Sequence, residues 1–318
     1  MAEIFCEAGA SNDMRNRDAE LAEKIIGLKR KRNAVILAHN YQLGEVQDIA
    51  DFVGDSLELS QNAAKTNADV IVFCGVHFMA ETAAILCPTK VVLLPDINAG
   101  CPLADMITPE RLQAKKKEHP QAVVVCYINS SAEVKAESDI CCTSANAVRI
   151  VQSLKAEQIL FVPDQYLGHY VASQTGKDMI LWPGFCPTHV RITPDRIKEL
   201  KREYPQAKVV VHPECRPEVI ALADEVASTS GMCHYARRDE VREMVVGTEI
   251  GIIHRLRKEN PGKKFIPVSE QAICPNMKLI TLEKVLWALQ EMQPQVKVPD
   301  EIQLKAKAAV DRMLEMGQ

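Results

Sequence analysis

The stretch Cys186–Thr193, CPTHVRIT, decides the fold of this chain of 318 residues, because the chain carries its pattern three times. The other copies are CPLADMIT, which begins at Cys101, and CPNMKLIT, which begins at Cys274, so the shared pattern is C-P-x-x-x-x-I-T. Chance does not account for three such matches, since each residue type makes up only a few per cent of an average sequence. The pattern therefore indicates an internal duplication, which has to be recognised before domains are assigned.

The duplication extends beyond the octapeptide into a helix and a strand. The segments CPLADMITPERLQAKKKEHPQAVVVCYIN and CPTHVRITPDRIKELKREYPQAKVVVHPE, which start at Cys101 and Cys186, align without a gap. Thr108 and Thr193 each precede a proline, which predicts a helix N-cap, and the β-branched run after each charged stretch predicts a buried parallel strand. The start of the chain supplies the third copy, with the helix LAEKIIGLKRKR before the strand NAVILAHNY.

Each copy is predicted to be a βαβ succession that ends in a Cys-Pro loop. We therefore expect an α/β fold of three pseudo-symmetric αβα units, whose parallel sheets are arranged around one central site. The predicted units are residues 21–107, 108–192 and 193–280. Residues 1–20 are expected to be a flexible tail, and residues 281–318 a C-terminal helical segment that packs back on the first unit.

Three cysteines are expected to meet where the units face one another. Ligands of open parallel sheets bind beyond the carboxyl ends of the strands, and a pseudo-three-fold arrangement brings those ends together. Cys101, Cys186 and Cys274 would share one site, and three thiolates suit zinc with a fourth ligand or an iron–sulfur cluster with one open iron. Cys87 also precedes a proline, but it lacks the I-T and the repeat register. It is expected to be a structural or surface thiol, as are Cys6, Cys74, Cys126, Cys141, Cys142, Cys215 and Cys233.

Other positions of the repeat carry different polar residues in each copy, as expected where an asymmetric molecule is bound. The residues that follow the first strands are His39, Tyr127 and His212, and two positions later come Tyr41, Asn129 and Glu214. These are types that form hydrogen bonds and transfer protons. His189 has no polar counterpart in the other copies, so it joins the set. Burial is expected to raise the pKa of Glu214 toward neutrality, which suits a general acid or base.

Hydroxyl residues open a helix in each copy, namely Ser56, Ser144 and Thr229. They are either simple N-caps or parts of anion sites, because free N–H groups and the helix dipole attract negative charge at a helix N-terminus. The aspartates of the repeat are interpreted as turn residues, namely Asp51, Asp139 and Asp224.

Composition narrows the classes of partner. The net charge of -4 and the pI near 6.1 argue against a nucleic-acid or membrane-surface partner, because no net basic field is present. No run of 18 apolar residues and no signal-peptide pattern occurs, and an odd number of 11 cysteines does not indicate a disulfide framework. A cytoplasmic protein is expected.

Eight motifs resemble, in the correct order, those of the quinolinate synthase A family of bacterial NAD biosynthesis. They are AHNYQ at 38–42, GDS at 54–56, FMAETA at 78–83, AGCP at 99–102, YINSSAEVKA at 127–136, PGFCPTH at 183–189, HPEC at 212–215 and CPNM at 274–277. The resemblance covers residues 21–290. It implies three pseudo-symmetric αβα domains around a [4Fe-4S] cluster, here bound by Cys101, Cys186 and Cys274.

The resemblance also implies a reaction. Iminoaspartate would condense with dihydroxyacetone phosphate to give quinolinate, phosphate and water, the open iron acting as a Lewis acid. L-aspartate oxidase is implied as the source of iminoaspartate. The implied substrate-binding residues are His39, Ser56, Tyr127, Asn129, Ser144, His212, Glu214 and Thr229. Those implied in proton transfer or positioning are Glu214, Tyr41 and His189.

Two alternatives use the same cysteines differently. A zinc-stabilised binding module for small dicarboxylates would need no catalytic Tyr or Glu. A radical enzyme is disfavoured because the C-x3-C-x2-C spacing is absent. Some members of the family have two further cysteines before the last ligand, but Val268 and Gln271 stand at those positions here, so no thiol switch is expected there.

Overall fold

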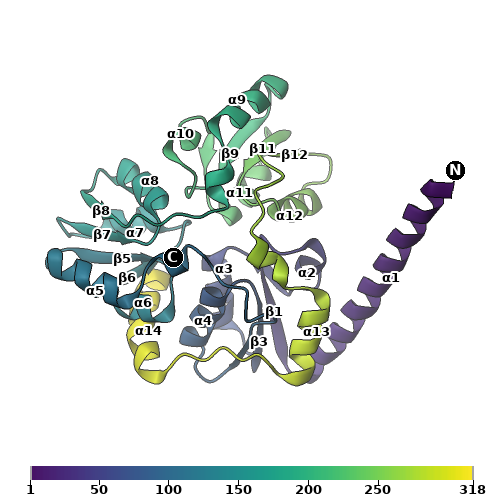
Figure 1. Ribbon diagram of the computed structural model, residues 1–318, viewed down its shortest axis with the longest axis horizontal. Coiled ribbons are helices and arrows are strands. Elements are labelled where there is room, and N and C mark those ends of the chain that lie inside the picture. Colours follow the sequence, from purple (N-terminus) through teal and green to yellow (C-terminus); the bar gives the residue numbers. More distant parts are fainter. Residues whose placement is uncertain (1, 317–318) are drawn as a thin grey trace.

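The computed structural model describes residues 2–316, with side chains from residue 16 onward, and contains three four-stranded sheets whose strands are all parallel. Figure 1 shows the sheets around a common centre. The first has the order β2-β1-β3-β4 and contains β1 (Ala34–His39), β2 (Phe52–Gly54), β3 (Val70–Cys74) and β4 (Val91–Leu93). The second, β6-β5-β7-β8, contains β5 (Val123–Tyr127), β6 (Ile140–Cys142), β7 (Ile159–Val162) and β8 (Met179–Leu181). The third, β10-β9-β11-β12, contains β9 (Lys208–Val211), β10 (Glu225–Val226), β11 (Glu243–Gly247) and β12 (Lys264–Pro267).

The order of strands is the same in all three sheets, which confirms the predicted α/β fold of three αβα units. The first unit has the helices α2 (Gly44–Asp48), α3 (Ser56–Lys65) and α4 (His77–Leu86). The second has α5 (Pro109–Glu118), α6 (Ala132–Ala136), α7 (Ala147–Ser153) and α8 (Gln165–Thr175). The third has α9 (Pro194–Glu203), α10 (Pro217–Ile220), α11 (Thr229–Ala236) and α12 (Ile252–Glu259). The 3₁₀ turns η1 (Ala104–Met106), η2 (His189–Arg191) and η3 (Pro275–Leu279) follow the cysteines of the repeat.

Local sequence signals account for several of these boundaries. The N-caps expected at Thr108 and Thr193 are confirmed, and Thr281 repeats them: each side chain accepts the N–H of the residue three positions later. The repeated aspartates do more than make turns, because each carboxylate accepts a backbone N–H of its unit's first strand at 2.8 Å. These bonds join Asp51 to Ile36, Asp139 to Val124 and Asp224 to Val209.

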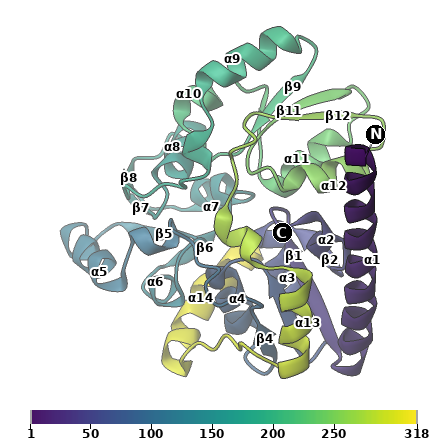
Figure 2. The same ribbon diagram turned by 45° about the vertical axis from the view of Figure 1, so that its right-hand side comes forward.

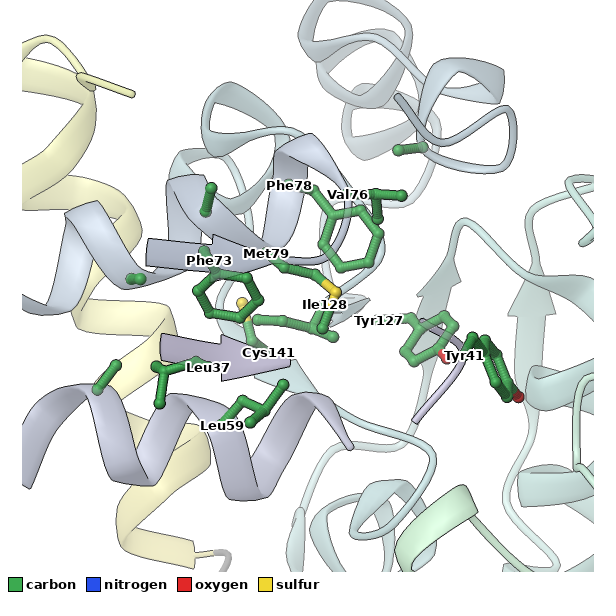
Figure 3. Packing of buried hydrophobic residues seen from close by; sticks show 14 of the residues in the cluster. Leu37, Tyr41, Leu59, Phe73, Val76, Phe78, Met79, Tyr127, Ile128 and Cys141 are labelled. Carbon is green, nitrogen blue, oxygen red and sulfur yellow. The ribbon is translucent and has the colours of Figure 1, made fainter. Parts of the chain in front are cut away.

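The hydrophobic core continues from the first unit into the second. Figure 3 shows Leu37, Phe73 and Leu59 of the first unit packed toward Cys141 and Ile128 of the second, with Tyr127 and Tyr41 at the end of this layer. The third unit adds a smaller cluster of its own, which includes Ile197, Val209 and Val219. The polar site therefore lies at the end of a continuous apolar layer, which restricts the access of water.

The terminal helices differ in part from expectation. Helix α1 (Ala2–Lys31) includes the segment that was predicted to be a tail, because this segment is rich in helix-forming residues and contains no proline. Figure 1 shows the first half of α1 projecting from the body. Helix α13 (Leu282–Glu291) packs on α1 and β3, as expected for a return to the first unit. Helix α14 (Asp300–Met316) instead lies between α4 of the first unit and α6 and β6 of the second (Figures 1 and 2). Within residues 2–316, no helix has the length and apolar character needed to cross a bilayer.

Candidate functional site

One cavity gathers every candidate site residue, and it is lined by residues of all three units. The three cysteines of the repeat line it, as do ten polar residues: His39, Tyr41, Ser56, Tyr127, Asn129, Ser144, His189, His212, Glu214 and Thr229. The carboxyl ends of parallel strands carry most of them, which is where such sheets bind ligands. Side chains as far apart in the sequence as His39 and Cys274 therefore meet in one cavity, because the three units share one topology.

The same backbone hydrogen bond holds each cysteine loop. In every unit, the N–H of the third residue after the third strand donates to the carbonyl of the residue two positions before the cysteine. The pairs are His77 N with Ala99 O at 2.7 Å, Gln165 N with Gly184 O at 2.9 Å, and Ile250 N with Ala272 O at 3.0 Å. The octapeptide pattern is thus the sequence of a loop that is fixed to its own sheet.

The three thiols share a second feature, a backbone N–H bond from the 3₁₀ turn. Burial raises the pKa of each thiol, to about 12 for Cys101, and a backbone N–H three residues later opposes the rise. The donors are Ala104, His189 and Met277. The pKa of Cys101 is further raised by the neighbouring Cys274, and that of Cys186 by Glu214 and then by Cys101. The thiols are therefore close enough to interact.

Exposure separates these thiols from the remaining cysteines. Cys101, Cys186 and Cys274 are half-buried and face the cavity, whereas the seven other described cysteines are buried. Cys6 lies outside the residues whose side chains are described. All ten described cysteines are free thiols. Three accessible thiols on one cavity fit a soft metal centre, because a thiophilic cation offsets the cost of ionising buried thiols.

A second group could also hold a metal ion. Ligand atoms of Cys186, His189 and Glu214 lie within 4.8 Å of one another. The two side chains other than the thiol are already engaged, since His189 Nδ1 lies 2.7 Å from Glu214 Oε2. The cavity therefore contains a candidate metal-binding group. The thiols of Cys101, Cys186 and Cys274 are its most available metal ligands.

A chain of polar contacts forms the wall beside the thiols. Tyr127 Oη donates to Glu214 Oε1 at 2.5 Å, and Glu214 Oε2 contacts His189 Nδ1. His189 Nε2 lies 2.8 Å from Thr248 Oγ1, which lies 2.5 Å from Tyr41 Oη. Burial, followed by the charge of Glu214, raises the pKa of both tyrosines well above the usual range, so both hydroxyls keep their protons.

The pKa expected for Glu214 is wrong in direction. Burial does raise it, but His189 outweighs burial through its charge and its hydrogen bond, and His212 and the Tyr127 hydroxyl add to this, so the pKa falls to about 2. Sequence reasoning accounted for burial and not for the two imidazoles and the tyrosine that surround the carboxylate. Glu214 is therefore ionised at neutral pH, which suits a hydrogen-bond acceptor or a base and does not suit an acid.

Two buried imidazoles occupy equivalent positions with the same tautomer. His39 Nδ1 accepts the N–H of Tyr41 at 3.2 Å, and His212 Nδ1 accepts the N–H of Glu214 at 3.3 Å. Burial is the main cause that lowers the pKa of each imidazole to about 3, so both rings are neutral and carry hydrogen on Nε2. These N–H groups are donors for a ligand, and that of His212 lies 3.2 Å from Ser144 Oγ.

The hydroxyls at the helix starts are not the N-caps. Asp55 caps α3, where its carboxylate accepts the N–H groups of Leu57 and Glu58, and Ser228 caps α11. Ser56 and Thr229 are thus freed from capping, although Thr229 Oγ1 accepts from Asn40 Nδ2 at 2.8 Å. The bonds to Asp55 also occupy N–H groups that were expected to bind an anion at α3. An anion in this cavity would therefore meet side-chain donors rather than these N–H groups of α3.

Sequence reasoning missed several residues of the site. Glu249 and Thr188 line the cavity, Thr248 joins the polar chain, and Asp55 faces the cavity as well. Glu249 is fully buried, and its carboxylate accepts the N–H of Cys274 at 3.1 Å. Thr248 and Glu249 follow the third strand of their unit, so a comparison of the residues after the third strands, as well as after the first, would have found both.

Comparison with known proteins is consistent with this geometry. The family model described as quinolinate synthetase A protein matches residues 23–315. A quinolinate synthase of Dehalococcoides mccartyi strain CBDB1 is 65% identical over 294 residues, which are 92% of this chain and 97% of that protein. A quinolinate synthase of Methanosarcina barkeri strain Fusaro is 58% identical, over 94% of this chain and 98% of its own. The chain therefore belongs to the quinolinate synthetase A protein family, a family of enzymes.

Proposed function

We propose that this enzyme makes quinolinate for NAD biosynthesis from iminoaspartate and dihydroxyacetone phosphate. One observation carries the proposal: three half-buried thiols of a three-fold repeat face one cavity, beside a wall of polar residues that differ between the units. The repeated part suits a cofactor, and the divergent part suits two unlike anionic substrates. The names of the relatives support the product, quinolinate.

The cofactor we propose is a [4Fe-4S] cluster held by Cys101, Cys186 and Cys274. Three of the described cysteines reach the cavity, so a cluster would keep one iron without a protein thiolate. When bound, that iron supplies Lewis-acid chemistry to a substrate oxygen or nitrogen. The alternative of a zinc-stabilised binding module for dicarboxylates is not favoured, because the relatives are named as synthases.

Substrate binding is proposed for the donors around the cavity. His39 and His212 each present a neutral Nε2–H group, which can donate to the carboxylates of iminoaspartate. Further donors are proposed to be Ser56, Ser144 and Thr229. The Tyr127 hydroxyl already donates to Glu214, so it is proposed to accept a hydrogen bond from the substrate. Asn129 Oδ1 is buried and has no hydrogen-bond partner among the described residues, which suits an acceptor for a substrate N–H or O–H group.

Proton transfer is proposed for the polar chain. The condensation gives quinolinate, phosphate and two waters, so protons must leave carbon and reach departing oxygens. Glu214 is ionised and can accept a proton at a carboxylate oxygen, whereas Tyr41 keeps its phenolic proton and can donate it. His189 contacts both Glu214 and Thr248, and it is proposed to position or pass a proton between them.

The proposal includes two statements about cellular context. Iminoaspartate would be supplied by L-aspartate oxidase, which produces it from aspartate. A cytoplasmic location is proposed because the ten described cysteines are all free thiols, as is usual in a reducing compartment.

The test combines metal analysis with product analysis. Protein purified without oxygen should be brown, contain about four irons per chain and form quinolinate from the two substrates. Glu214→Gln should keep the irons and lower turnover by about 100-fold or more, the usual contribution of an acid–base group. Colourless protein with one zinc would support the binding module instead. A Glu214→Gln turnover within a few-fold of the parent would rule out the role of Glu214.

A further inference from the structure

A fully buried lysine connects the first two units beside the cavity. Lys135 of α6 is 0% exposed, and its Nζ donates to the carbonyl of Ser130 in its own unit at 2.7 Å. Nζ also donates to the carbonyl of Phe78, in α4 of the first unit, at 3.3 Å. We propose that Lys135 is a positioning residue for the reaction, which holds the loop of Asn129 in place against the first unit. This inference rests on the proposed function, in which Asn129 binds the substrate.

The two carbonyls that Lys135 binds belong to the cavity wall or lie next to it. Phe78 lines the cavity, and so does Asn129, which precedes Ser130. Ser130 Oγ donates to the carbonyl of Tyr127 at 2.9 Å, so the loop is also held at the end of β5. The loop is therefore fixed between β5 and the first unit, and the carboxamide of Asn129 is fixed with it.

A contact in the opposite direction completes this connection. Glu81 of α4 is 8% exposed, and its Oε2 accepts the N–H of Ala132, the first residue of α6, at 3.1 Å. Burial lowers the pKa of Lys135, and the charge of Glu81 is the largest of the effects that oppose this fall. Because a buried charge without a partner costs free energy, the exchange of contacts between α4 and α6 makes a lysine possible here.

The internal repeat contains an equivalent connection between the first and third units. Strand pairing fixes the equivalent positions, namely Ala38, Cys126 and Val211 on the first strands and Cys74, Val162 and Gly247 on the third strands. By this register Gln47 of α2 corresponds to Lys135. Gln47 Nε2 donates to the carbonyl of Gln42 at 2.9 Å and to that of Gly251 in the third unit at 3.0 Å. These acceptors stand at the same two positions of the repeat, so two unlike side chains make the same pair of contacts.

The interface between the third and second units lacks this connection. Ile220 stands at the position of Lys135 there, and its side chain has no donor. The loop of Glu214 is instead held to the second unit directly, by Tyr127 and His189. Asn129 has no comparable bond at its Oδ1, which is without a partner among the described residues, so its position depends on the loop and on Lys135.

A set of lysine variants tests the inference. Lys135→Met is similar in length and has no donor, so it should lower kcat/KM by about 10- to 100-fold, mainly through a higher KM for iminoaspartate. Lys135→Gln places in the second unit the side chain that the first unit uses, and should stay within about threefold of the parent. Lys177→Met is the control and should match the parent, since Lys177 Nζ donates to Leu154 O at 3.0 Å within the second unit, away from the cavity. Iron content should be unchanged in all three, because each cysteine loop is fixed to its own sheet.

Hydrogen–deuterium exchange gives a second measurement that does not depend on activity. In metal-free protein, Lys135→Met should speed amide exchange about 10-fold in residues 128–132 and leave residues 208–213 of the third unit within about twofold. Lys135→Gln should match the parent in both segments. A kcat/KM of Lys135→Met within threefold of the parent, equal losses in the methionine and glutamine variants, or equally faster exchange in both segments would overturn the inference.

A further variant covers the case in which Lys135→Met does not fold, since this change leaves Glu81 buried without its partner charge. The double variant Lys135→Met/Glu81→Gln removes both charges and then replaces it in both measurements. A parent with about four irons that makes no quinolinate would refute the proposed function, while the exchange measurement would still decide whether Lys135 holds the loop.

Discussion

The Cys101 loop and the Cys274 loop follow the same sequence pattern and are supported differently. Both are fixed to their sheet by the same backbone hydrogen bond, and both place a thiol on the cavity. Two positions after the third strand stands Val76 in the unit of Cys101 and Glu249 in the unit of Cys274. The duplication has thus kept the part that presents the thiol, whereas the support behind it has changed from an apolar side chain to a charged one.

Glu249 joins the Cys274 loop to the loop of Tyr41. Its carboxylate accepts the N–H of Cys274 at 3.1 Å and that of Gly251 at 2.7 Å, and it pairs with Lys278 at 2.9 Å. Lys278 also donates to the carbonyl of Tyr41. Burial raises the pKa of Glu249, and Lys278 opposes the rise. Val76 makes no side-chain polar contact of this kind, so the third loop has an anchor that the first lacks.

The largest effect should come from removing a thiol, where the loops are expected to be equivalent. Cys101→Ala, Cys186→Ala and Cys274→Ala should each reduce the iron content from about four per chain to less than about one, because two thiolates would not retain the proposed cluster. Iron and sulfide analysis after anaerobic reconstitution measures this. Cys87→Ala is the control and should keep the iron, since Cys87 is buried and donates to Ala63 O at 3.1 Å. Four irons in Cys186→Ala would refute the assignment of the ligands.

A smaller effect should separate the two loops. Glu249→Ala should release iron to a chelator about 10- to 100-fold faster than the parent, because the Cys274 loop loses its anchor. Val76→Ala should stay within about threefold, since its backbone bond is kept. The rates are compared under anaerobic conditions, after thermal unfolding has shown that both variants are folded. Equal acceleration in the two variants would mean that Glu249 is not an anchor.

The smallest effect is expected in the second unit, where Asp164 occupies the same position. Asp164 caps α8 through Oδ1, and its Oδ2 has no hydrogen-bond partner among the described residues. Burial, followed by the charge of Glu214, raises the pKa of Asp164 well above its usual range, and backbone N–H groups, including that of Cys186, oppose the rise. Asp164→Asn keeps the capping oxygen, and its iron release should stay within about threefold of the parent. A tenfold faster release would place Asp164 with Glu249 as an anchor.

The sequence was sufficient for the architecture because the duplication repeats positions as well as residue types. Once His39, Tyr127 and His212 were aligned, the strand ends and the three cysteines followed from one topology. The second half of α1 was predicted, whereas its first half was expected to be a tail because those residues match no copy of the repeat. Thr248 was missed because its importance lies in contacts with the other two units. Glu249 was missed because its contacts with Cys274 and Lys278 join parts of one unit that no periodicity relates.

The electrostatics of the site could not be read from residue types. The pKa of Glu214 depends on His189, which is 25 residues away in sequence, and on Tyr127 in a different unit. Similarly, Ser56 and Thr229 resemble N-caps until the structure places Asp55 and Ser228 in that role. Burial was inferable from position, whereas the partners of a buried group depend on how the units face one another.

The position of α14 has a consequence for the order in which the protein matures. This helix is the last described element of the chain, yet it lies between the first two units, where Gln303 Nε2 bonds Ala84 O and Arg312 Nη1 bonds Asp139 O. Domains fold from the N-terminus during synthesis, so the first two units and their thiols exist before the helix that braces them. The proposed cluster would need Cys101, Cys186 and Cys274 together, so it would be added late, to a nearly finished protein rather than to a growing one.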